Sequence, residues 1–135
     1  MSSSYRIQAA TGIHRGDREY QQDQVLLMAH PYAKGCILGV VADGMGGRSG
    51  GRKASDQVML TARQVFERFE PAKEDCTRML RTIVQDAHTV IRLTAIAAEQ
   101  EPHSTIAVFV VLPDNRCYFM HSGDSRLYHF HGSSL

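Results

Sequence analysis

The sequence predicts an α+β fold in which strands and helices form separate layers. Two helical segments, each with one apolar face, follow one another between an N-terminal and a C-terminal group of short apolar strands. Helices that occur as a pair argue against alternating βαβ units and favour a layered α+β arrangement. At 135 residues the chain is expected to form one domain, residues 1–135.

Three short strands are expected before the first helix. Residues 5–10 and 24–29 are predicted as strands on either side of a polar connection, and residues 36–42 as a third strand that is apolar throughout. This third strand ends at Asp43, and the glycine-dense turn Gly44-Met45-Gly46-Gly47 follows at once. Glycines allow a ligand to approach the main chain closely, and a carboxylate beside free carbonyls suits a hard divalent cation. A tight turn with a capping aspartate is the alternative interpretation.

The predicted helices follow this turn. Between residues 54 and 69 the apolar residues recur every three or four positions: Ala54, Val58, Ala62, Val65 and Phe69. This spacing predicts a helix with one apolar face, which Pro71 ends. A second helix is expected over about residues 74–99, and Pro102 closes it.

The C-terminal part returns to strand character. Residues 105–112, 117–121 and 126–130 are predicted as strands, with turns at 113–116 and 122–125. Residues 132–135 resemble a hairpin turn whose return strand has only begun. The expectation is therefore either a fragment or a sheet edge that something else covers.

Composition and charge exclude several classes of partner. The net charge is +1 with an isoelectric point near 7.8, which gives no electrostatic basis for binding nucleic acid or an anionic membrane. No apolar run approaches the roughly 20 residues that span a bilayer. The first residues lack the hydrophobic core of a signal peptide, so a cytoplasmic location is expected.

The cysteines and histidines show no spacing typical of a metal site. Cys36, Cys76 and Cys117 are widely separated and are expected to be buried free thiols. The histidines at 121, 129 and 131 alternate, so they are expected on one solvated face of a strand.

Four segments, taken together, resemble the metal-dependent PPM/PP2C family of serine/threonine protein phosphatases, especially its bacterial members. They are residues 16–23 (GDREYQQD), 43–47 (DGMGG), 103–107 (HSTIA) and 122–126 (SGDSR). The resemblance extends over the whole chain but covers only about the first half of such a domain. It implies a β-sandwich of antiparallel sheets flanked by helix pairs, here incomplete.

The resemblance also implies an active site with two Mn²⁺ or Mg²⁺ ions and a third, weaker metal site. Asp43 matches the carboxylate that bridges the metals, Gly44 the residue whose carbonyl reaches one of them, and Asp23 the acidic residue that ends the first motif. Arg18 matches the arginine that binds the substrate phosphate, and Asp124 an aspartate of the weaker site. Oxygen ligands favour Mg²⁺ or Mn²⁺ over Zn²⁺, and a planar guanidinium matches phosphate oxygens. Alone, Arg18 would be a surface arginine, and Asp23 and Asp124 turn residues.

The chain departs from the family pattern in several places. Gln22 stands where many members have Glu, Met45 where several eukaryotic members have a His proposed as general acid, and His103 where a Gly is usual. The later SDG-type and DN-type aspartates are absent, since the only Asp-Asn pair, Asp114-Asn115, comes far too early. Without those ligands the two-metal mechanism should fail or be greatly weakened.

Two hypotheses about function follow. The first is a protein phosphatase of bacterial signalling, acting on phosphoserine and phosphothreonine proteins, of which this chain is an N-terminal portion with impaired activity. The second is a non-catalytic PP2C-like binding module that acts through a partner, such as a complementing C-terminal half or a strand-exchanged second copy. A third hypothesis, a nucleotide-binding glycine loop, fits the sequence poorly, because the Gly-Lys-Ser/Thr of a P-loop does not follow the glycine turn.

Overall fold

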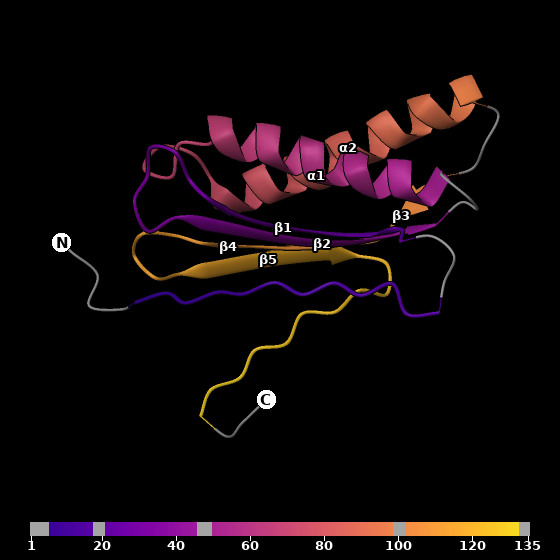
Figure 1. The fold of residues 1–135 in the computed structure, drawn as a ribbon. Helices are drawn as coiled ribbons and strands as arrows, with labels where there is room; N and C mark the ends of the chain where they lie inside the picture. Colours follow the sequence, from indigo (N-terminus) through magenta and orange to yellow (C-terminus); the bar gives the residue numbers. More distant parts are fainter. Residues whose placement is uncertain (1–5, 18–20, 46–49, 99–101, 133–135) are drawn as a thin grey trace.

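The computed structural model describes residues 6–17, 21–45, 50–98 and 102–132. In chain order the elements are β1 (Asp23–Ala29), β2 (Ile37–Met45), α1 (Gly50–Arg68), α2 (Cys76–Ala98), β3 (His103–Ser104), β4 (Ile106–Val111) and β5 (Cys117–Ser122). The strands form one antiparallel sheet in the order β1-β2-β4-β5, with β3 paired to the end of β2. Both helices lie on the same face of this sheet (Figure 1), so the predicted α+β class is confirmed.

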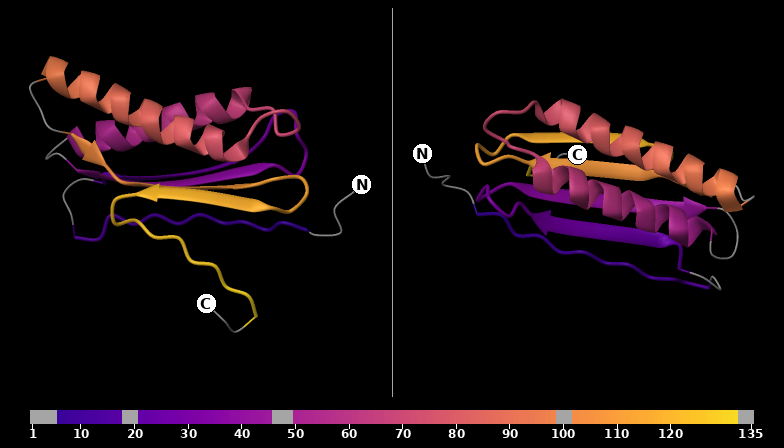
Figure 2. Two further views of the ribbon diagram at one scale, coloured as in Figure 1. Left: turned by 180° about the vertical axis from the view of Figure 1, so that it is seen from behind. Right: turned by 90° about the horizontal axis from the view of Figure 1, so that it is seen from above.

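The hydrophobic core lies between the helices and the sheet. Seen from above, α1 lies over β1 and β2 while α2 lies over β4 and β5 (Figure 2). Alternate residues of β2 point into this layer, and Leu38, Val40 and Ala42 are fully buried there. The helices contribute Phe66, Leu80 and Ile83, which are equally inaccessible to solvent.

The opposite face of the sheet carries apolar side chains that solvent reaches. Val41 is 49% exposed and Phe119 is 57% exposed, and both alternate with residues of the core. Beside them the ring of Phe109 lies over Gly39, where an added Cβ would be 2.2 Å from a ring carbon. In the described residues this face therefore has no second layer comparable to the helix pair.

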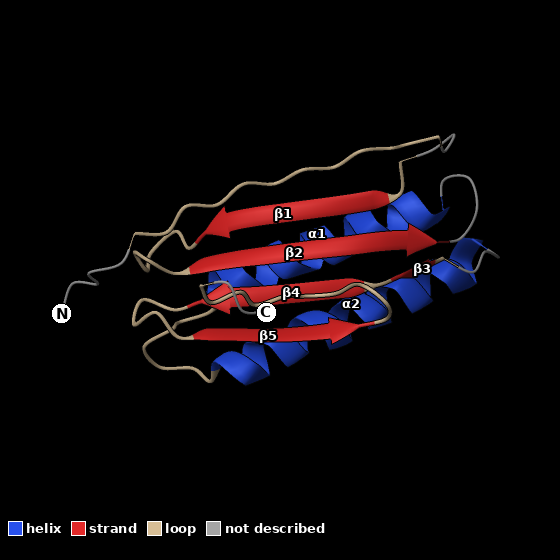
Figure 3. Cartoon of the chain, turned by 90° about the horizontal axis from the view of Figure 1, so that it is seen from below, coloured by secondary structure: helices blue, strands red, loops and turns tan. Residues whose placement is uncertain are grey.

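Two predicted strands are not strands in the structure. The described part of the first, residues 6–10, follows the outer side of β1 without entering the sheet (Figures 1 and 3). Residues 126–130 leave the end of β5 and extend away from the sheet on the side without helices (Figure 1). Both segments have strand-like composition, but strand propensity forms a strand only where a pairing partner is available. His129 therefore does not share a strand face with His121.

The remaining boundaries differ by a few residues from those predicted. β2 continues through Asp43 to Met45, so the aspartate lies within the strand and not after it. α1 begins at Gly50, and α2 begins at Cys76 because the Asp75 carboxylate caps it, accepting a hydrogen bond from the Thr77 N–H at 2.9 Å.

The three cysteines are free, but only two of them are buried. Cys36 and Cys76 lie in the core, whereas Cys117 is exposed at the first position of β5, contrary to the prediction. None of the described helices is both long and apolar enough to cross a bilayer.

Candidate functional site

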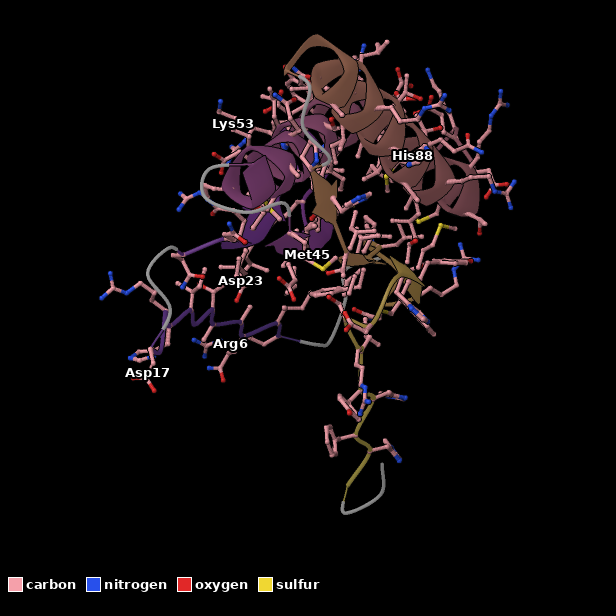
Figure 4. The ribbon with its side chains drawn as sticks, turned by 90° about the vertical axis from the view of Figure 1, so that its right-hand side faces the viewer. Arg6, Asp17, Asp23, Met45, Lys53 and His88 are labelled. Carbon is pink, nitrogen blue, oxygen red and sulfur yellow. The ribbon has the colours of Figure 1, made fainter. Side chains whose placement is uncertain are left out.

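Asp23 and Asp43 face each other across the β1–β2 pair. They are directly opposed in the antiparallel register, and both are half-buried. Opposed residues of an antiparallel pair place their Cβ atoms roughly 5 Å apart on the same face of the sheet. Since Ala42 points into the core, the neighbouring Asp43 points to the face without helices. Asp23 extends toward that side in Figure 4.

A groove of about 230 Å³ opens beside the two carboxylates. Strand residues form one wall, and the N-terminal segment forms the other through Gly12, Ile13 and His14. The Nδ1 atom of His14 accepts a hydrogen bond from the Gly16 N–H at 2.9 Å, so the neutral ring carries its proton on Nε2. His14 was not among the predicted site residues, because nothing local in the sequence places it beside Asp43.

Gly44 holds the end of β2 against the start of α1. Its N–H donates to the carbonyl of Gln22 at 3.1 Å, and the buried hydroxyl of Ser55 on α1 donates to the same carbonyl at 2.7 Å. The Arg52 guanidinium adds a bond to the Gln21 carbonyl at 3.3 Å. These bonds join the residues just before Asp23 to β2 and α1, so the relative position of the two carboxylates is set by three elements.

Thr105 holds Asp43 from the other side. The Asp43 N–H donates to the Thr105 hydroxyl oxygen at 3.1 Å, and the Thr105 N–H donates to the Asp43 carbonyl at 2.9 Å. The same hydroxyl lies 2.5 Å from the hydroxyl of Ser125. The third and fourth motifs therefore meet at Thr105, the first residue of the strand predicted over residues 105–112.

The other two predicted site residues are less closely placed. Asp124 is exposed in the bend after β5, and its neighbour Ser125 connects it to Thr105. Arg18 lies outside the described residues.

The donor chemistry fits a hard cation, but the number of ligands is small. Two carboxylates and a main-chain carbonyl are the oxygen donors that Mg²⁺ and Mn²⁺ prefer, and the Oδ1 atom of Asp43 is buried. Within the described part of the chain, however, no three His, Cys, Asp or Glu side chains converge closely enough to hold a metal ion. Asp23 and Asp43 alone are too few to complete the shell of six or more oxygen ligands that such a cation takes.

A larger groove, of about 890 Å³, lies at the opposite end of the sheet. Both ring nitrogens of His30, the buried histidine that lines this groove, are hydrogen-bonded to the main chain. The Nε2 atom donates to the Phe69 carbonyl at 2.7 Å, and Nδ1 accepts bonds from the N–H groups of Tyr32 and Ala33 at 3.1 Å each. With both ring nitrogens hydrogen-bonded to the main chain, His30 anchors the loop between β1 and β2.

A model of the protein phosphatase 2C family matches residues 12–134. The chain belongs to the protein phosphatase 2C family. The match includes all four motifs and both carboxylates of the β1–β2 pair. No curated protein matches the sequence.

Solved structures of two bacterial phosphatases share the fold of this PP2C chain. The Mycobacterium tuberculosis serine/threonine phosphatase PstP/Ppp superposes with a TM-score of 0.67 at 24% identity, over 81% of this chain and 43% of its own. The S. agalactiae serine/threonine phosphatase gives a TM-score of 0.65 at 24% identity, over 81% of this chain and 45% of its own. The chain thus spans less than half the length of the structures it matches.

Proposed function

We propose that this chain is part of a metal-dependent protein serine/threonine phosphatase, which hydrolyses phosphoserine and phosphothreonine with a metal-activated water. The observation that carries the proposal is the direct opposition of Asp23 and Asp43 beside an open groove. When bound, a pair of Mn²⁺ or Mg²⁺ ions would supply a water of lowered pKa and neutralise charge at phosphorus. Phosphoproteins of the cytoplasm are the proposed substrates, in a bacterial signalling role.

Each predicted site residue has a distinct role in this proposal. Asp43 and Asp23 hold the cations with the help of the Gly44 carbonyl, and Asp124 holds a further, weaker one. Arg18 binds the phosphate of the substrate through its planar guanidinium, which matches two phosphate oxygens at once. The strand pairing keeps the two carboxylates in place before any cation arrives, so little reorganisation is needed on binding.

The small number of oxygen ligands in the groove supports a metal site that is completed by residues from outside this chain. Two opposed carboxylates are few for two divalent ions, which take six or more oxygen ligands each. We therefore propose that full activity needs further acidic ligands from a complementing C-terminal half or from a second copy of the chain.

The test is hydrolysis of a phosphothreonine peptide by the whole chain with Mn²⁺. We expect weak hydrolysis that Asp43→Asn abolishes, and a large increase when the later half of a related domain is added. Asp86→Asn, on the exposed face of α2, is the matched control because it removes a carboxylate far from the groove. Equal rates for Asp43→Asn and the unchanged chain would overturn the assignment of Asp43.

A second candidate function, a non-catalytic binding module, is supported by the uncovered apolar face of the sheet. Val41 and Phe119 are exposed there, and apolar sheet faces are normally packed in a folded domain. Sedimentation velocity of the chain and of Phe119→Thr tests self-association through this face. We expect the unchanged chain to associate with increasing concentration and the variant to remain monomeric. If both the unchanged chain and Phe119→Thr are monomeric, self-association through this face is refuted. A binding module would then have to act on a different partner.

A further inference from the structure

Thr105 stands at a break in the strand ladder, directly beside Asp43. Ser104 pairs with Gly44 and Ala107 pairs with Val41, and this constant register places Thr105 opposite Asp43. At that position the Asp43 N–H bonds to the hydroxyl of Thr105, where a regular ladder would offer a main-chain carbonyl. The Thr105 carbonyl instead accepts a bond from the Ser104 hydroxyl at 2.8 Å.

The side chain of Thr105 also contacts the turn that contains Asp124. Thr105 is only 3% exposed, and its hydroxyl contacts that of Ser125. Its methyl group packs against Gly123, where an added Cβ would lie 2.8 Å from the Thr105 Cγ2 atom. Gly123 has a φ of +98°, so both the backbone conformation and the contact require glycine.

A single hydroxyl therefore connects two candidate ligand segments. A threonine hydroxyl has one donor and two acceptor positions, so it can accept from the Asp43 N–H and still bond to Ser125. Since the group is buried, water cannot easily replace either partner, and loss of one bond alters the geometry of the other.

We infer that Thr105 is a positioning residue that couples the Asp43 strand end to the Gly123-Asp124-Ser125 turn. A displacement of the turn changes the main-chain hydrogen bond of Asp43, although Asp124 and Ser125 belong to a different segment. The coupling stands on the hydrogen bonds alone. Its consequence, that a cation held at Asp124 alters cation binding at Asp43, rests on the proposed function.

The test measures hydrogen exchange of the Asp43 amide by NMR in the whole chain without metal. Ser125→Ala is expected to speed this exchange about threefold, and Thr105→Val about tenfold, since a lost hydrogen bond is worth roughly 1 kcal/mol. Thr105→Ser keeps the hydroxyl and is expected to restore exchange to near the original rate. In the Thr105→Val background, Ser125→Ala should have no further effect.

Two matched variants separate coupling from general destabilisation. Thr61→Val changes a buried threonine on α1, and Ser122→Ala changes an exposed serine at the end of β5. Rates are normalised to the amide of Ala62 in the core, so that global unfolding cancels. The inference is overturned if Ser125→Ala changes the Asp43 rate no more than Ser122→Ala does. Should Thr105→Val fail to fold, Ser125→Ala and Thr105→Ser still decide the question.

The measurement distinguishes this inference from the proposed function. Adding Mn²⁺ to the same samples should broaden the Asp43 and Asp124 amide signals if the chain holds cations there. Exchange coupling without Mn²⁺ broadening would support the role of Thr105 and count against the metal site.

Discussion

Gly44 and Gly51 pack backbone to backbone where the end of β2 meets the first turn of α1. A Cβ on Gly44 would lie 1.9 Å from the carbonyl oxygen of Gly51, and a Cβ on Gly51 would lie 2.8 Å from the carbonyl carbon of Gly44. The glycine after Asp43 is therefore required for packing of a helix against a strand, in addition to the ligand role that the sequence suggests.

We predict that Gly44→Ala lowers the free energy of unfolding by about 3 kcal/mol, because the added methyl group meets main-chain atoms that cannot rotate away. Urea denaturation followed by circular dichroism measures this change. Gly12→Ala is the control, since nothing lies within 4 Å of a Cβ added there. Equal stability of the two variants would contradict the packing seen at Gly44.

Asp23→Asn is expected to stabilise the metal-free chain while removing its response to Mn²⁺. Like charges placed directly opposite each other on two strands are unfavourable by roughly 0.5 kcal/mol, and neutralising one of them relieves the repulsion. A bound cation would compensate the same repulsion, so Mn²⁺ should raise the melting temperature of the unchanged chain only. Thermal unfolding at low salt with and without Mn²⁺ measures both effects.

The control for this pair is Asp86→Asn on α2, which should keep the Mn²⁺ response. A melting temperature that rises with Mn²⁺ equally in Asp23→Asn and in the unchanged chain would place the cation elsewhere.

Ser55→Ala is expected to lower the free energy of unfolding by about 1 kcal/mol. The Ser55 hydroxyl is fully buried and donates to the Gln22 carbonyl at 2.7 Å, a bond that ties α1 to the segment preceding Asp23. Urea denaturation gives the stability, and Mn²⁺ affinity measured by calorimetry should fall as well. Ser122→Ala, at an exposed position of β5, should change neither quantity.

Stability should fall as the pH rises from 9 to 11. Burial raises the pKa of the Cys36 thiol to about 11, and burial, with Cys36 nearby, raises that of Cys76 to about 11, from an ordinary 9.0. The folded state thus keeps protons that the unfolded chain releases above pH 9, so the stabilisation is complete below 9 and is lost as the pH approaches 11.

Urea denaturation between pH 8 and 11 checks this dependence against the Cys36→Ala/Cys76→Ala double variant, whose curve should fall less steeply. Cys117→Ala is the comparison variant: burial also raises the pKa of that thiol, but it is exposed at the start of β5, so its removal should change the slope less. Parallel curves for the double variant and the unchanged chain would refute the assignment to the buried thiols.

Much of the local structure could be predicted, because it depends on patterns within a few residues. The period of the apolar residues in α1 and the continuous apolar run of β2 each identify an element type. Residues 6–10 and 126–130 have the composition of strands without being strands, since strand formation depends on partners distant in the sequence. The exposure of Cys117 could not be predicted from its neighbours in the sequence either. It depends on which face of β5 is covered, and in the described residues no layer covers the face that bears Cys117.

Patterns within a few residues predict the α+β class, the helix pair, four of the six expected strands and the motifs that mark Asp23, Asp43, Gly44 and Asp124. Which groups these residues contact depends on the tertiary structure. It opposed Asp23 to Asp43, brought His14 to the same groove, and joined Asp43 to Ser125 through the hydroxyl of Thr105. Helical and strand periods are encoded in neighbouring residues, whereas strand register and buried hydrogen bonds join residues far apart in the chain. The register and the buried hydrogen bonds therefore form only when the core packs.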